Sequence, residues 1–356
     1  MGNPAQNGAQ KMSKDSSKYH QTKIKFFNMS IQENKVKAGI IGGSGYTGGE
    51  LIRLLINHSK VELVFVQSKT NKGKYIQEIH TDLVGQDKIK FVNKMDSEID
   101  VLFLCVGHNQ SKKFLDNNKV DKKIKIIDLS QDFRISSTYS KRNFVYGLPE
   151  LNKNEIIKSS SIANPGCFAT AIQLGLLPFA VNNNLNGEIN INAITGSTGA
   201  GVKLSKTSHY SWRNNNVSWY KAFDHQHLNE INLNLKSLNK KQHEIVFIPI
   251  RGNFTKGIFC TMYFKNKLTL DQVKMLYENH YKNSSFVHVS DNEIDLKQVL
   301  NTNNCIIHLK KDGERILITS IIDNLIKGAA GQAIQNMNLM FGLDEDLGLK
   351  LKSSFF

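Results

Sequence analysis

A single cysteine, Cys167, follows the turn residues Pro165 and Gly166 and precedes an apolar run with helical spacing over residues 170–180. The proline and the glycine force a tight reversal, so Cys167 is predicted at or near the start of a helix. Unpaired N–H groups and the helix dipole favour negative charge there, and we therefore expect a lowered thiol pKa and a nucleophilic thiolate. The alternative is a small buried side chain without chemistry, which is common for free cysteines.

Two histidines, His225 and His227, could take up and return a proton near neutral pH. In an extended segment they would share a face, so their spacing does not separate their roles, and two ordinary surface histidines remain the alternative. Arg251 ends an apolar segment and is a candidate partner for a phosphate or a carboxylate, because a guanidinium binds such groups bidentately.

A glycine loop follows the first apolar run, residues 36–41, and a helical pattern follows the loop. Gly42, Gly45 and Gly48 allow a tight turn and let the backbone approach a pyrophosphate, which then rests on the helix N-terminus. A second apolar run over residues 61–66 completes a βαβ unit. The segment therefore predicts a Rossmann-type dinucleotide-binding domain.

The end of the second predicted strand indicates which dinucleotide is bound. No carboxylate stands there for the ribose hydroxyls, and Ser68, Lys69 and Lys72 suit a 2′-phosphate instead. We expect NADP(H), with a plain solvated loop as the alternative. His108, after the predicted strand 101–106, is expected in the cofactor loops, with a catalytic role as the alternative, whereas Cys105 is expected inside that strand as inert core.

The remaining pattern predicts an α/β protein in which a doubly wound parallel sheet is followed by an α+β domain. Strands are expected at 124–129 and 189–195, followed in the second case by a small-residue loop, 196–201, whose N–H groups could bind an anion. Residues 244–251 and 258–264 are expected as directly paired antiparallel strands. Asp132 and Arg134 could pair with each other, and Cys260 and Cys305 are expected in the core.

Composition excludes several classes of protein. With 356 residues, 40% hydrophobic and 22% charged, the chain has the size and the balance of a soluble two-domain protein. Its four cysteines are scattered, so neither a disulfide framework nor a metal site is expected. The net charge of +15 is spread over many lysines without a basic and aromatic stripe, and we expect no nucleic-acid partner. No run is long enough to span a membrane.

Residues 1–34 read as a disordered leader rich in Asn, Gln, Ser and Lys. The expected location is cytoplasmic, and the leader leaves organellar targeting open.

At this point the motifs identify a resemblance. Seven motifs occur in the same order in N-acetyl-gamma-glutamyl-phosphate reductases, and this chain resembles a member of that family from about residue 36 to residue 342. The motifs are Gly42-Gly43-Ser44-Gly45-Tyr46-Thr47-Gly48, Asp128-Leu129-Ser130-Gln131-Asp132-Phe133-Arg134, Tyr146-Gly147-Leu148-Pro149-Glu150, Asn164-Pro165-Gly166-Cys167, Gly196-Ser197-Thr198-Gly199-Ala200-Gly201, His225-Gln226-His227-Leu228-Asn229-Glu230-Ile231 and Asp323-Asn324-Leu325-Ile326-Lys327-Gly328-Ala329-Ala330-Gly331-Gln332-Ala333. Many members have Arg after the sixth residue of the fifth motif, where this chain has Val202-Lys203.

The resemblance implies a semialdehyde-dehydrogenase-like fold and a reaction. Residues 35–166 and 324–356 would bind NADP(H), and residues 167–323 would form an inserted catalytic and oligomerisation domain of a homodimer or homotetramer. A small acyl phosphate, N-acetyl-gamma-glutamyl phosphate, would be reduced through a Cys167 thioester in arginine biosynthesis, with His225 as acid and base. The residues implied in binding are Tyr220, His227, Glu230, Arg251, Ser197 and Gly199 for the substrate, and Gly42, Ser44, Gly45, Tyr46, Thr47, Gly48, His108 and Asn324 for the cofactor.

Three alternatives remain open. An aspartate-semialdehyde dehydrogenase would use the same thioester logic, but the segments 225–227 and 323–333 argue against it. A reductase of an N-succinyl or carrier-bound acyl phosphate differs only in the group on the substrate nitrogen. A non-catalytic basic nucleotide-binding or nucleic-acid-binding protein would have no need of Cys167 and His225 in one cleft.

Overall fold

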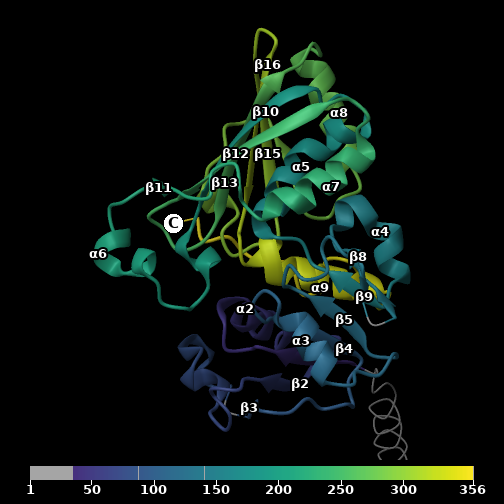
Figure 1. Cartoon of the computed structure of the whole chain (residues 1–356), viewed down its shortest axis with the longest axis vertical. Coiled ribbons are helices and arrows are strands. Elements are labelled where there is room, and N and C mark those ends of the chain that lie inside the picture. The colour runs from purple at the N-terminus through teal and green to yellow at the C-terminus, as the bar shows by residue number, and fades with distance from the viewer. Residues whose placement is uncertain (1–34, 87, 140, 356) are drawn as a thin grey trace, which may run out of the picture. The chain divides into compact units, whose positions relative to one another are not determined.

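The computed structural model describes residues 35–86, 88–139 and 141–355 (Figure 1). The predicted leader, residues 1–34, lies outside the described residues. From Val36 onward the chain is organised by two seven-stranded sheets, and a short separate hairpin joins β6 (Thr138–Tyr139) to β7 (Arg142–Asn143).

The first sheet is parallel throughout. In order across the sheet its strands are β3 (Phe91–Val92), β2 (Val61–Gln67), β1 (Val36–Ile41), β4 (Val101–Leu104), β5 (Lys125–Asp128), β9 (Ser161–Ala163) and β8 (Val145–Tyr146). All neighbouring pairs run parallel. The chain reverses its direction of winding at β1, as in the doubly wound fold, and the Rossmann-type prediction is confirmed.

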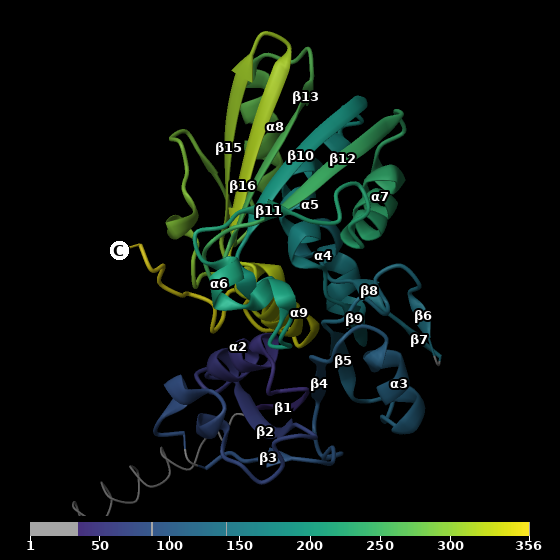
Figure 2. The ribbon, with the colours of Figure 1, turned by 60° about the vertical axis from the view of Figure 1, so that its left-hand side comes forward.

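Helices cover both faces of this sheet because successive strand residues alternate between two cores. Ile40 and Phe103 pack in the core that also holds residues of α2 (Tyr46–Leu55), α4 (Pro149–Lys158) and α9 (Gly331–Met340). Ile41 and Leu104 pack in the other core, against α3 (Gln110–Asn117). Figure 2 shows α3 apart from α2 and α9. The last helix thus returns to the first sheet, as the resemblance implied.

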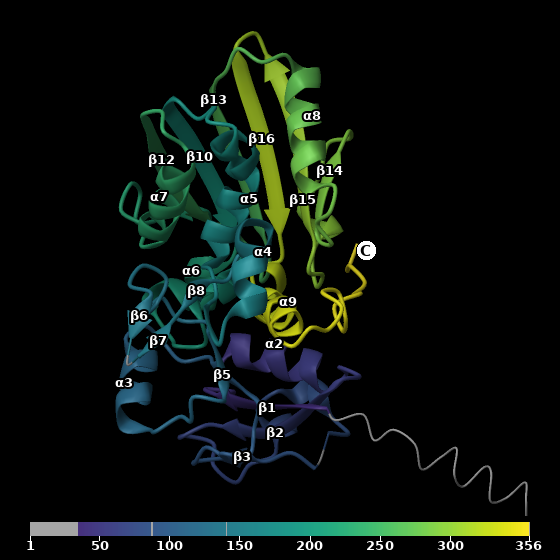
Figure 3. The same ribbon diagram turned by 90° about the vertical axis from the view of Figure 1, so that its right-hand side faces the viewer.

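The second sheet mixes parallel and antiparallel pairs, as expected of an α+β region. Its strands, in order, are β11 (Ser218–Trp219), β12 (His243–Arg251), β10 (Gly187–Thr195), β13 (Ile258–Lys265), β16 (Arg315–Ile322), β15 (Cys305–Asp312) and β14 (Val287–Ser290). Helices α5 (Cys167–Val181), α7 (His227–Leu238) and α8 (Leu270–Tyr281) share one apolar core with this sheet (Figure 3). Cys260 and Cys305 are buried in that core, as predicted.

One strand pairing differs from the prediction. The strands β12 and β13 do not pair with each other, because β10 lies between them, parallel to β12 and antiparallel to β13. The connection over residues 252–257 therefore crosses the end of β10 instead of closing a tight hairpin. It also accepts backbone hydrogen bonds from Gly196, Ser197 and Thr198, which come directly after β10.

Short elements complete the chain. They are the 3₁₀ turns Ile76–Glu78, Thr81–Leu83, Ser197–Ala200, Lys206–Ser208 and Leu296–Gln298, the helix α6 (Tyr210–Arg213), and a π-helical turn, Ile326–Ala330, which runs into α9. Within the described residues, no helix has the length and the apolar character needed to cross a membrane.

Candidate functional site

A cavity of about 730 Å³ is lined by loops from both sheets. The first sheet contributes residues 45–47 after β1 and 105–108 after β4, and the second contributes residues 195–203 after β10. Among the described residues the lining includes no Asp or Glu, whereas it includes five cationic side chains. These are Arg134, Lys203, Arg213, Lys221 and Arg251. The cavity is therefore suited to anionic ligands.

Cys167 is the first residue of α5 and lines this cavity, as the turn before it predicted. Gly166 is the N-cap, and its carbonyl accepts the first backbone hydrogen bond of the helix, from Thr170. The π-helical turn packs closely against the cysteine, since a Cβ added to Gly328 would lie 2.7 Å from Cys167 Cβ. The nucleophile candidate therefore lies at the start of α5 and against the middle of the π-helical turn.

The expected lowering of the thiol pKa is not found in the unliganded protein. Burial raises the pKa of Cys167 to about 11, and the Arg134 charge and the backbone N–H groups of the helix start oppose this only in part. The helix start therefore acts as predicted, but desolvation outweighs it. A neighbouring base must remove the proton before the sulfur can attack at neutral pH.

His225 and His227 both line the cavity, and their ring centroids are 4.7 Å apart. His225 precedes α7, and its Nδ1 accepts a hydrogen bond from the backbone N–H of His227 at 3.2 Å, so the neutral ring carries its proton on Nε2. Burial, with the Lys221 charge, lowers the pKa of His225 to about 4, and burial also lowers the pKa of His227 strongly. Both rings are therefore neutral near pH 7.

The ring of His227 packs directly against the turn that holds Cys167, because a Cβ added to Gly166 would collide with His227 Nε2. Its Nδ1 is buried without a hydrogen-bond partner. Its Nε2 lies 4.0 Å from Glu230 Oε1, which is too long for a hydrogen bond.

A buried ionic network supports the cysteine turn. Arg134 pairs with Glu230 at 3.0 Å, so the pair with Asp132 that the sequence left open is not formed. Glu230 also accepts hydrogen bonds from Tyr146 Oη at 2.7 Å and from the Gly166 backbone N–H at 3.2 Å. Since Glu230 is saturated and is not among the cavity-lining residues, the geometry favours support of the turn over substrate contact.

The carboxylate of Asp132, which does not pair with Arg134, caps the start of α3. It accepts hydrogen bonds from the backbone N–H groups of Asn109, at 2.6 Å, and Lys112, at 3.1 Å, at the start of α3. A short acidic side chain satisfies the unpaired donors at the start of a helix, so its place is explained without a ligand.

The glycine loop fits a dinucleotide phosphate. Gly42 has φ = +82°, and a Cβ there would lie 2.6 Å from the Cys105 carbonyl oxygen, so a side chain is excluded. A Cβ on Gly48 would lie 2.7 Å from Gly43 Cα, which keeps α2 close to β1. Gly45 lines the cavity and meets nothing closer than 3.9 Å, so its backbone is open to a ligand at the N-cap of α2.

The structure places the other predicted cofactor residues in two groups. Tyr46, Thr47, His108 and Asn324 line the cavity. Ser68 lies beside the loop, where its hydroxyl donates to Ser44 Oγ at 3.1 Å. Lys69 and Lys72 are exposed and lie outside the cavity lining.

The amide of Asn324 is already engaged. Its oxygen accepts from the Gly257 N–H at 2.6 Å, and its nitrogen donates to Thr198 Oγ1 at 3.1 Å. It therefore ties the β12–β13 connection to the turn after β10.

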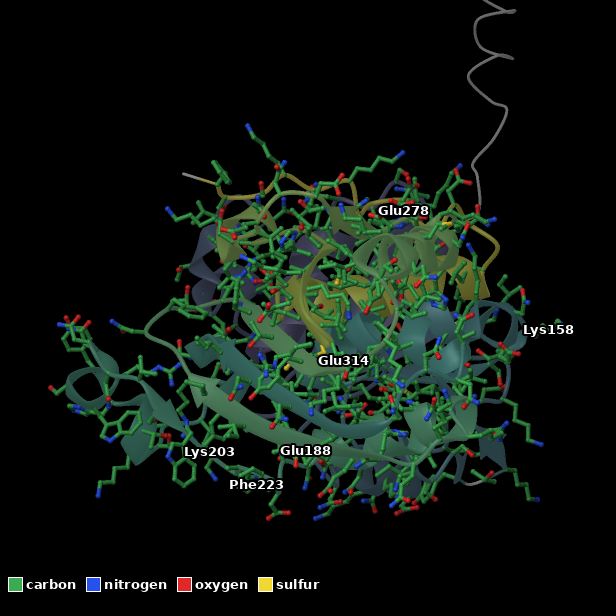
Figure 4. The ribbon with its side chains drawn as sticks, turned by 90° about the horizontal axis from the view of Figure 1, so that it is seen from above. Lys158, Glu188, Lys203, Phe223, Glu278 and Glu314 are labelled. Atoms are coloured by element: carbon green, nitrogen blue, oxygen red, sulfur yellow. The ribbon has the colours of Figure 1, made fainter. Side chains whose placement is uncertain are left out.

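Among the predicted substrate residues, Ser197, Gly199, Tyr220 and Arg251 line the cavity. The guanidinium of Arg251 stacks on the Tyr220 ring, 3.9 Å from its centroid. In the loop after β10, the N–H groups of Gly196, Ser197 and Thr198 donate to residues 254–257, so these three are not open to an anion. Figure 4 shows Lys203, which follows this loop, on the same side of the second sheet as Phe223.

The cavity residues that were not predicted include Arg213 and Cys105. Arg213 ends the short helix α6, in a segment without any motif, and no signal in the sequence marks it. Cys105 was expected inside a strand, but β4 ends at Leu104. The side chain of Cys105 is therefore only partly buried, and it lines the cavity. Burial nevertheless raises the pKa of its thiol above that of Cys167.

No group of three or more His, Cys, Asp or Glu side chains that could hold a metal ion occurs in the described part of the chain.

Comparisons with known proteins assign the chain to a family. Residues 37–159 match the model of the semialdehyde dehydrogenase NAD-binding domain, and residues 167–324 match the semialdehyde dehydrogenase dimerisation domain. The prediction of a nicotinamide dinucleotide domain is therefore confirmed, and the second match agrees with an oligomeric protein.

The fold also occurs in solved structures with low sequence identity. Aspartate semialdehyde dehydrogenase II from Vibrio cholerae, complexed with ASA, has a TM-score of 0.68 at 14% identity, over 86% of this chain and 98% of that one. The Candida albicans enzyme with NADP has a TM-score of 0.66 at 14% identity, over the same shares of the two chains. These likenesses establish the fold alone.

Curated relatives are much more similar. Proteins named N-acetyl-gamma-glutamyl-phosphate reductase match at 55% identity in Bacteroides thetaiotaomicron, 53% in Christiangramia forsetii and 56% in Flavobacterium johnsoniae. Each match covers 90% of this chain and 100% of the relative. The resemblance seen in the motifs is thus confirmed over nearly the whole chain, which belongs to the N-acetyl-gamma-glutamyl-phosphate reductase family.

Proposed function

We propose that this chain reduces N-acetyl-gamma-glutamyl phosphate to N-acetylglutamate 5-semialdehyde and phosphate with NADPH, as a step of arginine biosynthesis. The observation that carries the proposal is the common cavity of Cys167, the two histidines and the open glycine loop. Family membership supports the identity of the substrate. The alternatives with other acyl phosphates become outcomes of the test below.

The cofactor is NADP(H) rather than NAD(H). The residues after β2 support this choice, since the buried Ser68 hydroxyl stands next to Ser44 at the glycine loop and no carboxylate occurs from residue 68 to residue 77. Lys69 and Lys72 are exposed on the same loop and are available to a 2′-phosphate. Gly45, Tyr46 and Thr47 would hold the pyrophosphate at the start of α2, and bound NADPH supplies a hydride.

The protein's own groups carry the acyl chemistry. Cys167 Sγ, once deprotonated, attacks the γ-carbonyl carbon, and the tetrahedral adduct expels phosphate to leave a thioester. Addition of hydride to the thioester carbonyl gives a thiohemiacetal, whose collapse releases the aldehyde and returns the thiolate. The Arg134 charge favours the thiolate at both ends of this sequence, because it opposes the desolvation that raises the pKa of Cys167.

The proton transfers belong to the histidine pair. His225 is the proposed acid, because the hydrogen bond from the His227 N–H leaves its Nε2 proton free to be donated to the developing alkoxide. To accept the Cys167 proton at Nε2, His225 would first have to carry its own proton on Nδ1, and it would then lose the hydrogen bond from the His227 N–H. His227, whose Nδ1 has no partner and whose ring touches Gly166, is the second candidate for removal of the Cys167 proton.

The substrate-binding roles rest on the cavity lining. We assign Arg251 and Tyr220 to the substrate, with Ser197 and Gly199 beside the phosphate and Asn324 near the nicotinamide. His227 and Glu230 support the cysteine turn, Glu230 through Arg134 and Gly166.

The division of the chain into a cofactor domain, residues 35–166 and 324–356, and a catalytic domain, residues 167–323, is part of the proposal. A homodimer or homotetramer is supported by the open face of the second sheet, where Val246, Ile248, Phe259 and Tyr263 are covered only in part. The four free cysteines support a cytoplasmic location.

The decisive experiment is phosphate-dependent reduction of NADP by the purified protein. N-acetylglutamate 5-semialdehyde, its N-succinyl analogue and aspartate semialdehyde are compared under the same conditions. We expect turnover with the acetylated aldehyde at a kcat/KM at least tenfold above the others, consistent with about 1.4 kcal/mol or more of discrimination. Preference for another aldehyde would reassign the substrate, and absence of turnover with all three would overturn the proposed function.

A further inference from the structure

Arg213 is a cation in the catalytic cavity that has no counter-ion within the described part of the chain. Its Nε and Nη2 atoms are buried and have no hydrogen-bond partner. Its backbone is fixed, because Asn253, with its amide turned to satisfy both groups, donates to the Arg213 carbonyl at 3.2 Å and accepts from the Asn215 N–H at 2.9 Å. A guanidinium held in this way without a partner is costly, unless a ligand supplies one.

A second arginine faces the same space. Arg251 stacks on Tyr220, 3.9 Å from the ring centroid, and has no acidic partner among the described residues. The burial of Arg213 and the neighbouring charge of Arg251 both lower the pKa of Arg213. Both arginines line the cavity, whose described lining includes no carboxylate. Two like charges therefore stand together where only an anionic ligand can compensate them.

The position of the pair indicates which anion it receives. The acyl phosphate is attached to the carbon that the sulfur attacks, so the phosphate must lie next to Cys167. From the cysteine turn a series of ring contacts leads away from the sulfur: His227 packs on Gly166, His225 lies 4.7 Å from His227, and Tyr220 lies 5.8 Å from His225, measured between ring centroids. Arg251 stacks on Tyr220 at the end of this series, and Asn253, two residues after Arg251, holds the Arg213 carbonyl. The arginine pair therefore lies beyond Tyr220, toward the other end of the substrate.

We propose that Arg213 and Arg251 together bind the α-carboxylate of the substrate. The inference rests on the proposed function. Two guanidinium groups give a carboxylate up to four N–H donors in fork geometry.

The test compares two aldehydes in the phosphate-dependent reduction of NADP. N-acetylglutamate 5-semialdehyde has the carboxylate, and 4-acetamidobutanal is the same chain and amide without it. For the unmodified protein we expect KM to be at least tenfold lower for the carboxylate-bearing aldehyde. Arg213→Gln should raise that KM about tenfold or more, and should change kcat/KM for 4-acetamidobutanal less than twofold.

Controls separate binding from folding and from the proposed function. Arg315→Gln removes an exposed arginine on the β15–β16 hairpin and should leave every constant unchanged. NADPH binding should be the same in all three proteins, neither variant should melt below the unmodified protein, and Arg213→Lys should recover part of the lost affinity.

Two results would overturn the inference. One is an equal loss on both aldehydes for Arg213→Gln, and the other is a rise in the KM for inorganic phosphate in place of that for the aldehyde. If the unmodified protein turned over neither aldehyde, the proposed function would fail instead, so the two failures are distinguishable.

Discussion

Lys256 Nζ lies 2.5 Å from Glu50 Oε1, and this ion pair joins the β12–β13 connection to α2, the helix that begins at the glycine loop. Lys256 also donates to Asn301 Oδ1 at 3.2 Å. The same connection holds the turn after β10 through the Ser197 and Thr198 N–H groups. The pair therefore links the proposed pyrophosphate site mechanically to the catalytic cavity.

Breaking the ion pair between Lys256 and Glu50 should lower the free energy of unfolding. Glu50 is nearly buried, with 9% of its side chain exposed, and Lys256 is 26% exposed, so removal of one partner leaves a poorly solvated charge. We expect Lys256→Met to lower the free energy of unfolding by about 1–3 kcal/mol, and Glu50→Gln combined with Lys256→Met to cost less than the sum of the single changes. Urea unfolding measures both.

The exposed pair Lys310 and Glu293 is the matched control, with 65% and 84% of the side chains exposed. Lys310→Met should change the free energy of unfolding by less than about 0.5 kcal/mol. Equal effects at Lys256 and Lys310, or additive effects of the two changes at the internal pair, would show that no link exists.

The cysteine should titrate at high pH in the unliganded protein. Because burial raises the pKa of Cys167 to about 11, the thiolate fraction should rise about tenfold per pH unit between pH 7 and pH 10. The rate of iodoacetamide labelling at Cys167, followed by peptide mass spectrometry, should follow that slope. A rate that is flat above pH 7 would mean a lowered pKa, as the sequence alone suggests.

Local patterns predicted the local parts of the site, and tertiary contacts decided the rest. The glycine loop and the helix start at Cys167 depend on neighbouring residues and are found as expected. The high pKa of the thiol depends on burial by distant segments such as the turn at Gly328. A sequence pattern does not contain that desolvation.

The same reasoning explains the errors in pairing. Arg134 and Glu230 are 96 residues apart, so the sequence offered only the neighbouring Asp132 as a possible partner of Arg134. The strands β12 and β13 are adjacent in sequence, yet β10 comes between them. Arg213 belongs to no recognised sequence motif. It is identified as a candidate binding residue only by its buried, unpaired nitrogens in the cavity.

Cofactor preference tests the reading of the loop after β2. A charge-assisted phosphate contact contributes about 1.5–3 kcal/mol, so NADPH should bind at least tenfold more tightly than NADH. Ser68→Ala should reduce this ratio, because Ser68 is buried beside Ser44, and titration calorimetry with both nucleotides measures it. Lys122→Gln, on an exposed segment far along the chain, is the control. Equal affinity for the two nucleotides in the unmodified protein would contradict the assignment.

Substitution of His225 and of His227 should slow different steps of the reaction. If His225 is the acid, His225→Asn should lower kcat by at least about a hundredfold, while pre-steady-state release of phosphate from the acyl phosphate persists. His227→Asn should instead slow that release if His227 removes the Cys167 proton. Loss of the phosphate burst in His225→Asn and its retention in His227→Asn would exchange the two roles.

Replacement of the nucleophile is the strongest test of covalent catalysis. Cys167→Ser should lower kcat by several orders of magnitude, on the order of a thousandfold or more, because a serine hydroxyl is not ionised near neutral pH and an oxygen ester accepts hydride less readily than a thioester. NADPH affinity should be unchanged, since the proposed dinucleotide site is the glycine loop and does not involve the cysteine. Cys105→Ser is the matched control, because Cys105 lines the same cavity but lies beside Gly42 instead of at a helix start. An equal loss in Cys105→Ser, or near-normal turnover in Cys167→Ser, would remove Cys167 from the mechanism.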